Sequence, residues 1–139
     1  MKVKDIMHSK VTWVGPDETL SRIATKMRDD DIGAIPVGEN DRLVGMVTDR
    51  DITCRAVAGS GDMKKLKARD VMTKNVVWCH DTDDIAEAAH LMESKKIRRL
   101  PVIDRNKRMV GMLSLGDFAG RAPKSLSGEI VAAVAAHHG

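Results

Sequence analysis

Two copies of one pattern constrain the fold of this chain most strongly. Shifting the sequence by 65 residues, and by 66 after one insertion in the second copy, aligns the chain with itself. The clearest aligned segments are Asp5–Met7 with Asp70–Met72, Pro36–Val37 with Pro101–Val102, and Val44–Met46 with Val110–Met112. A solenoid needs at least about three units, so two copies predict a pseudo-symmetric pair of modules.

Each copy predicts the element order β-α-β-β-α. In the first copy, residues 11–14 alternate and are rich in β-branched side chains, which predicts a short strand that Gly15-Pro16 ends. A helix ending near Asp30 follows from apolar residues at helical spacing, namely Leu20, Ile23, Ala24 and Met27. The other predicted elements are a short helix or turn at 2–7, strands at 34–37 and 43–48 around a hairpin turn at 38–41, and a second helix from 49 to about 58.

The repeat divides the chain into an α+β pair of modules. The modules span residues 2–58 and 67–121, a linker covers 59–66, and a tail covers 122–139. In the tail, Ser127 is a candidate cap for a helix over residues 128–138, which we expect to pack on its own module or on a second subunit.

Composition excludes several classes of function. Hydrophobic residues make up 42% and charged residues 31%, as in an ordinary globular domain, and the net charge of +3 is spread over mixed signs. Such a surface offers few phosphate contacts, which argues against nucleic-acid binding. There is no run of 18 apolar residues to span a membrane and no apolar leader at the start. We therefore expect a cytoplasmic protein whose cysteines, Cys54 and Cys79, stay reduced.

The repeated residues resemble a tandem pair of cystathionine-β-synthase (CBS) domains, known as a Bateman module. The marks are Asp-Ile/Val-Met at 5–7 and 70–72, Ala/Arg-Ile/Leu-Pro-Val at 34–37 and 99–102, and Val-Gly-Met-Val/Leu-Thr/Ser-x-x-Asp at 44–51 and 110–117. The chain is similar to small stand-alone bacterial CBS-pair proteins. The resemblance implies two three-stranded sheets facing each other across a pseudo-twofold axis, commonly in a homodimer. It also implies clefts between the repeats for AMP, ADP, ATP, NAD or S-adenosylmethionine.

A hydroxyl and a carboxylate recur at the end of each copy. Thr48 precedes Asp51 by three residues, and Ser114 precedes Asp117 by three. A carboxylate can accept hydrogen bonds from both hydroxyls of a ribose, and a hydroxyl at a helix start suits a phosphate. The resemblance implies these same contacts. The alternative is helix capping worth roughly 1 kcal/mol, although recurrence in both copies favours ligand binding.

Other residues are candidates for contacts to the base and the phosphates. Those for the apolar walls around an adenine are Met46, Met112, Ile32, Val11 and Val76, each of which could instead serve core packing alone. The copies differ at Gly33-Ala34 against Arg98-Arg99. In the resembled family a basic residue here often reaches a phosphate, which suits the planar guanidinium of Arg98 or Arg99. The alternative is a solvated basic patch, and the sequence does not say which cleft these arginines face.

These patterns predict a non-catalytic regulatory module that binds an adenosyl ligand. No nucleophile–base pair, P-loop or metal motif is present in the sequence, and His8, His80 and His90 lack ligand spacing. We therefore expect no enzymatic activity, no metal and no required cofactor. An effector protein would read the bound state. The rival interpretation is a ligand-free protein–protein interaction module whose function is dimerisation.

Overall fold

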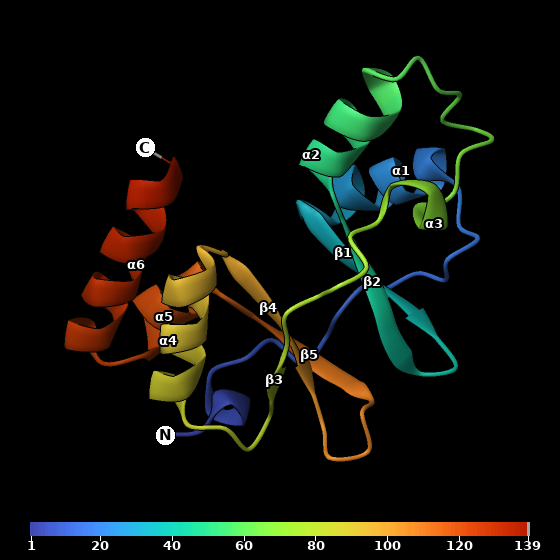
Figure 1. The fold of residues 1–139 in the computed structure, drawn as a ribbon. Helices are drawn as coiled ribbons and strands as arrows, with labels where there is room; N and C mark the ends of the chain where they lie inside the picture. Colours follow the sequence, from blue (N-terminus) through green and yellow to red (C-terminus); the bar gives the residue numbers. More distant parts are fainter. Residues whose placement is uncertain (139) are drawn as a thin grey trace. The chain divides into compact units, whose positions relative to one another are not determined.

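The computed structural model describes residues 1–138, and the chain divides into two compact units (Figure 1). The central unit is formed by Thr12–Val76. The composite unit combines Met1–Val11 with the chain from Val77 onward. These units do not coincide with the sequence repeats, because the opening segment of each repeat packs with the remainder of the other repeat.

The central unit consists of a two-stranded antiparallel sheet with helices packed against it. Its elements are α1 (Leu20–Asp30), β1 (Ala34–Glu39), β2 (Arg42–Thr48), α2 (Asp49–Asp51), a π-helical turn (Ile52–Val57) and α3 (Ala68–Val71). Helix α1 begins after Thr19, whose side chain accepts a hydrogen bond from the backbone N–H of Arg22 at 3.4 Å. The core is aliphatic and includes Ala68 and Val71 from the opening segment of the second repeat.

The composite unit has a three-stranded sheet in the order β3-β4-β5. Its elements are a 3₁₀ turn (Val3–Asp5), β3 (Cys79–His80), α4 (Ile85–Lys95), β4 (Arg99–Ile103), β5 (Met109–Ser114), α5 (Leu115–Arg121) and α6 (Lys124–His138). Val3 and Ile6, from the start of the chain, are buried in its core with Phe118.

The predicted strand at residues 11–14 is wrong in extent, and prolines explain why. Only Val14 pairs with β1, through bonds to the carbonyl of Pro36 and from the N–H of Gly38. This parallel ladder cannot continue on either side of Val14. The next bond on one side would need an N–H from Pro36 and the next bond on the other side an N–H from Pro16, and proline has no backbone N–H. In the composite unit Asp81 replaces Pro16, and its N–H donates to the Ile103 carbonyl at 3.0 Å, so β3 forms.

Helix α6 packs within the composite unit, beside α4 and α5 (Figure 1). Ile130 of α6 is fully buried in the core of this unit. The predicted start of the tail helix is wrong, because α6 begins at Lys124 and the Ser127 hydroxyl donates to the Lys124 carbonyl at 3.1 Å. Pro123 sets this earlier start, since a helix leaves its first N–H groups unpaired and a proline there loses nothing.

The tail also explains why one predicted core position is wrong. The spacing predicts Ala24 on the buried face of α1, but Ala24 is exposed, whereas its counterpart Ala89 in α4 is fully buried. The difference arises because α6 covers α4, and the tail lies outside the repeat, so the chain of the central unit contains no matching helix. The other three apolar positions of α1 are buried as predicted.

Candidate functional site

Each unit holds one hydroxyl–carboxylate pair where a strand runs into a helix. We call Thr48 with Asp51 the Asp51 pair, and Ser114 with Asp117 the Asp117 pair. The backbone N–H of Thr48 donates to Oδ2 of Asp51 at 2.9 Å, and the N–H of Asp51 donates to Oγ1 of Thr48 at 3.1 Å. In the Asp117 pair the corresponding distances are 2.8 and 3.4 Å.

Both pairs are therefore capping boxes, as the alternative interpretation of the motif predicted. This does not compete with ligand binding. The box uses only Oδ2 of each carboxylate, and a carboxylate has two oxygens with about four acceptor positions. What surrounds the second oxygen, Oδ1, decides whether each pair can accept anything else.

The surroundings of Oδ1 differ between the two pairs. Oδ1 of Asp51 lies 3.8 Å from the guanidinium of Arg55, which is beyond hydrogen-bond distance, and 13% of the Asp51 side chain is exposed. Oδ1 of Asp117 lies 2.6 Å from Nε2 of His8, and only 2% of the Asp117 side chain is exposed. His8 itself is 56% exposed, so its imidazole is the outer group over a buried carboxylate.

The opening segments of the repeats run alongside these pairs in matching ways. His8 exchanges two backbone hydrogen bonds of 2.9 Å with Met112 of β5. Thr73, which stands where His8 does in the repeat, exchanges bonds of 2.9 and 3.0 Å with Met46 of β2. Each opening segment therefore adds one paired residue to the strand that leads into the hydroxyl–carboxylate pair.

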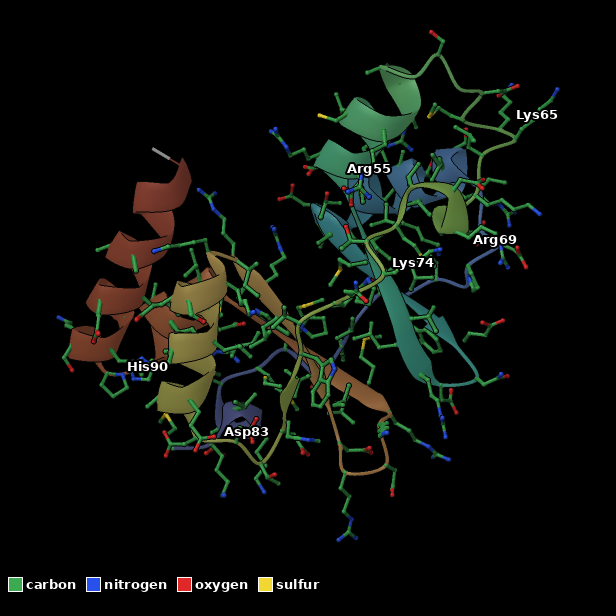
Figure 2. The ribbon with its side chains drawn as sticks, in the orientation of Figure 1. Arg55, Lys65, Arg69, Lys74, Asp83 and His90 are labelled. Carbon is green, nitrogen blue, oxygen red and sulfur yellow. The ribbon has the colours of Figure 1, made fainter. Side chains whose placement is uncertain are left out.

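An arginine one turn after each carboxylate also holds the opening segment. Arg55, labelled in Figure 2, donates from its guanidinium to the Val71 carbonyl at 2.8 Å. Arg121 donates in the same way to the Ile6 carbonyl at 3.2 Å. The site in each unit is therefore built by a strand, the following helix and the opening segment of the other repeat.

Each residue predicted to wall an adenine ring belongs to the same unit as one of the two pairs. Met46 and Met112 are half-buried, two residues before Thr48 and Ser114 on strands whose burial alternates, so each methionine shares a strand face with its hydroxyl. Ile32 is half-buried in the central unit. Because the opening segments exchange, Val11 belongs to the unit of the Asp117 pair and Val76 to the unit of the Asp51 pair.

The strand register assigns the two predicted arginines to the Asp117 pair. Arg99 is the cross-strand partner of Ser114, and the Arg98 carbonyl accepts from the N–H of Leu115 at 3.1 Å. Both side chains are exposed. At the Asp51 pair the same positions are Gly33 and Ala34, which carry no charge.

Comparison with known proteins identifies the family to which this chain belongs. The sequence matches the CBS domain over residues 3–56 and 68–123. This chain belongs to the CBS-domain family. It is 37% identical over 132 residues to hypoxic response protein 1 of Mycobacterium tuberculosis, an alignment that covers 94% of this chain and 92% of that protein. Pairs of CBS domains are regulatory modules.

Solved structures share the fold of this CBS pair. Hypoxic Response Protein I with two coordinated zinc ions superposes with a TM-score of 0.81 at 38% identity, covering 88% of this chain and all of that one. The CBS domain pair of protein MJ0100, in complex with 5′-methylthioadenosine and S-adenosyl-L-methionine, has a TM-score of 0.73 at 27% identity, covering 86% and 93%.

Two further properties concern the part of the CBS pair that the structure describes. Among residues 1–138, no helix is both long and apolar enough to cross a bilayer. Within the same described residues, no three His, Cys, Asp or Glu side chains gather as a metal site would require.

His8, Arg55 and Arg121 are site residues that sequence reasoning missed. His8 was considered only as a metal ligand, although the repeat aligns it with Thr73 and so marks a difference between the copies. Arg55 and Arg121 also align with each other at a spacing of 66. The sequence alone does not show that the opening segments exchange between the units, and this exchange brings these residues to the carboxylates.

Alkaline pH should lower the free energy of unfolding because the thiol of Cys79 is buried in the folded protein. Burial, with smaller contributions from Asp83 and Asp81, raises the pKa of Cys79 from 9.0 to about 12. The unfolded thiol ionises first, so this contribution to stability is full below pH 9 and is lost progressively between pH 9 and 12. Between pH 8 and pH 10 we expect the free energy of unfolding of the wild-type protein to fall by about 1 kcal/mol more than that of Cys79→Ala.

Urea unfolding of both proteins at the two pH values measures this difference. The chain has no tyrosine, and every titratable side chain other than Cys79 is the same in both proteins. Equal pH dependence of the two unfolding free energies would show that Cys79 ionises as easily in the folded state as in the unfolded chain.

Proposed function

We propose that this CBS pair is a non-catalytic regulatory module that binds adenosine-containing ligands through the Asp51 and Asp117 pairs. The observation that carries this proposal is the repeated junction in which a hydroxyl and a carboxylate form a capping box that leaves Oδ1 out of the box. A motif needed only to cap a helix does not require a half-buried methionine on the same strand face as its hydroxyl, as Met46 and Met112 are.

The ligand chemistry follows from these groups. The carboxylate accepts hydrogen bonds from the ribose hydroxyls, and the half-buried Met46 and Met112 offer an apolar surface to the adenine. The two ligands in the MJ0100 structure share an adenosine core, which supports this class. Arg98 and Arg99 add positive charge beside the Asp117 pair, so phosphate-bearing ligands such as AMP, ADP, ATP or NAD are candidates there along with S-adenosylmethionine.

Regulation requires that ligand change the balance between two states of the protein. A ligand shifts such a balance only by the difference in its affinity for the two states. We propose that the module acts in the cytoplasm as a homodimer and that an effector protein distinguishes the ligand-bound state.

Thermal unfolding with AMP, ADP, ATP, NAD and S-adenosylmethionine tests the proposal, using protein shown to be free of co-purified nucleotide. A ligand at 100 times its dissociation constant adds about 2.7 kcal/mol to the free energy of unfolding. We expect at least one of the five to raise the unfolding temperature. If none does, the function is instead that of a ligand-free interaction module.

Asp51→Ala should weaken the binding of the ligand so identified by about 1–3 kcal/mol, the range for a lost hydrogen bond to a charged group. Asp49→Ala is the matched control, because Asp49 is exposed two residues away and its carboxylate accepts a hydrogen bond from the neighbouring N–H of Arg50 at 2.8 Å. Isothermal titration calorimetry measures both variants. Unchanged affinity in Asp51→Ala would show that ribose is not bound at this carboxylate.

A further inference from the structure

The two hydroxyl–carboxylate pairs are not equivalent, and one side chain makes the difference. The backbone frame is the same in both units: an opening segment paired with the strand, an arginine on its carbonyl, and a capping box on Oδ2. Within this frame the residue of the opening segment that pairs with the strand is Thr73 in the central unit and His8 in the composite unit. Among the ion pairs and hydrogen bonds of the described residues, a side chain of the opening segment contacts Oδ1 of the carboxylate only in the composite unit.

The His8 contact occupies the atom that a ribose would need. Nε2 of His8 lies 2.6 Å from Oδ1 of Asp117, within ion-pair distance. The hydroxyl and backbone N–H of Ser114 already donate to Oδ2, at 3.1 and 2.8 Å. Asp117 is therefore engaged at both oxygens and 3% exposed, while Asp51 keeps Oδ1 without a hydrogen bond.

We propose that His8 closes the Asp117 pair to ligand, so that an adenosine-containing ligand binds first at the Asp51 pair and reaches Asp117 only by displacing the imidazole. This inference rests on the proposed function and adds an order of occupancy to it. Displacement is feasible because His8 is more than half exposed and is held to the unit through its backbone bonds to Met112, which do not depend on the imidazole.

Displacing His8 lowers the net binding free energy that the ligand gains at Asp117. A ribose hydroxyl that replaces His8 gains a hydrogen bond to Asp117 but loses the 2.6 Å contact with His8, whereas Oδ1 of Asp51 has only the longer 3.8 Å contact with Arg55. Because His8 is exposed, solvent reduces the strength of its contact below that of a buried pair. We therefore expect removal of the imidazole to strengthen binding at Asp117 by about tenfold, at the lower end of the range for bonds to charged groups.

The test isolates the Asp117 pair by silencing the other pair with Asp51→Ala. The probe is 5′-methylthioadenosine, which carries the ribose but no phosphate, so Arg98, Arg99 and a freed His8 gain no phosphate contact. Calorimetry compares Asp51→Ala with Asp51→Ala/His8→Thr, in which position 8 receives the residue of the other repeat. We expect the double variant to bind about tenfold more tightly.

The reciprocal variant, Thr73→His in an Asp117→Ala background, places an imidazole beside Asp51 and should weaken binding there by about tenfold. Each substitution copies a residue that the same backbone already accommodates in the other unit, so both variants should fold. Binding that is unchanged by His8→Thr while the Asp51 pair still binds the probe would overturn the role of His8 and leave the proposed function standing. Absence of probe binding in wild-type protein and in every variant would overturn the order of occupancy, whereas the proposed function is overturned only if none of the five ligands tested above stabilises the protein.

Discussion

Replacing Phe118 with alanine is expected to lower the free energy of unfolding by about 3–5 kcal/mol, the range for truncating a fully buried aromatic side chain. Phe118 is the only phenylalanine of the chain and is completely buried in α5, in the core of the composite unit. It follows Asp117 directly, so the cavity left by truncation would also loosen the helix that presents the carboxylate. Urea unfolding monitored by fluorescence measures the loss.

Each unit contains one of the two tryptophans, so the fluorescence signal reports the unfolding of both units. Trp78 belongs to the composite unit and Trp13 to the central unit. Phe118→Ile is the matched control, since isoleucine is the residue at the equivalent position, Ile52, and it preserves most of the buried volume. We expect this control to lose less than half as much stability. A loss below about 1 kcal/mol for Phe118→Ala would contradict the packing described for this core.

Gly111→Ala is expected to lower the free energy of unfolding by about 1–3 kcal/mol, because the strand passes too close to the opening segment to hold a side chain. A Cβ atom at Gly111 would lie 2.6 Å from Sδ of Met7 and 2.7 Å from the carbonyl oxygen of His8. Methionine can rotate away, but that carbonyl is held by its bond from the N–H of Met112. The substitution should therefore push the opening segment off β5.

Two glycines provide controls for Gly111→Ala. At Gly45 the methionine sulfur of Met72 is equally close, at 2.5 Å, but the carbonyl oxygen of Thr73 is farther, at 3.1 Å, so Gly45→Ala should cost less. Gly120 in α5 has nothing within 4 Å of the added atom, and Gly120→Ala should raise stability by roughly 0.5–1 kcal/mol through helix propensity. Equal urea midpoints for all three variants would rule out this account of the close approach.

Much of the local structure followed from the sequence, since it depends on nearby residues. Helical spacing placed α1, which ends at Asp30 as predicted. The repeat identified two equivalent hydroxyl–carboxylate pairs and showed that Arg98 and Arg99 have no counterpart in the first copy. The resemblance to CBS pairs was confirmed by the match over both repeats. The roles of the site residues in binding, and the homodimer, stay predictions.

Other features were decided by residues distant in sequence. The strand at 11–14 was predicted from its own composition, but a ladder needs donors on both chains, and Pro36 together with Pro16 removed them. Ala24 and Ala89 have the same local pattern, and only the packing of α6 on α4 makes one of them buried.

By itself, then, the sequence determined the repeat, most of its elements and the chemistry of the two carboxylate pairs, because spacing along one chain fixes which groups share a strand face or a helix turn. Only the tertiary structure decided what stands over each carboxylate. The opening segments exchange between the units, and this exchange sets His8 against Asp117, whereas Thr73, at the equivalent position, pairs with Met46. A contact between residues more than a hundred positions apart depends on how buried segments pack, and no periodicity in the sequence encodes it.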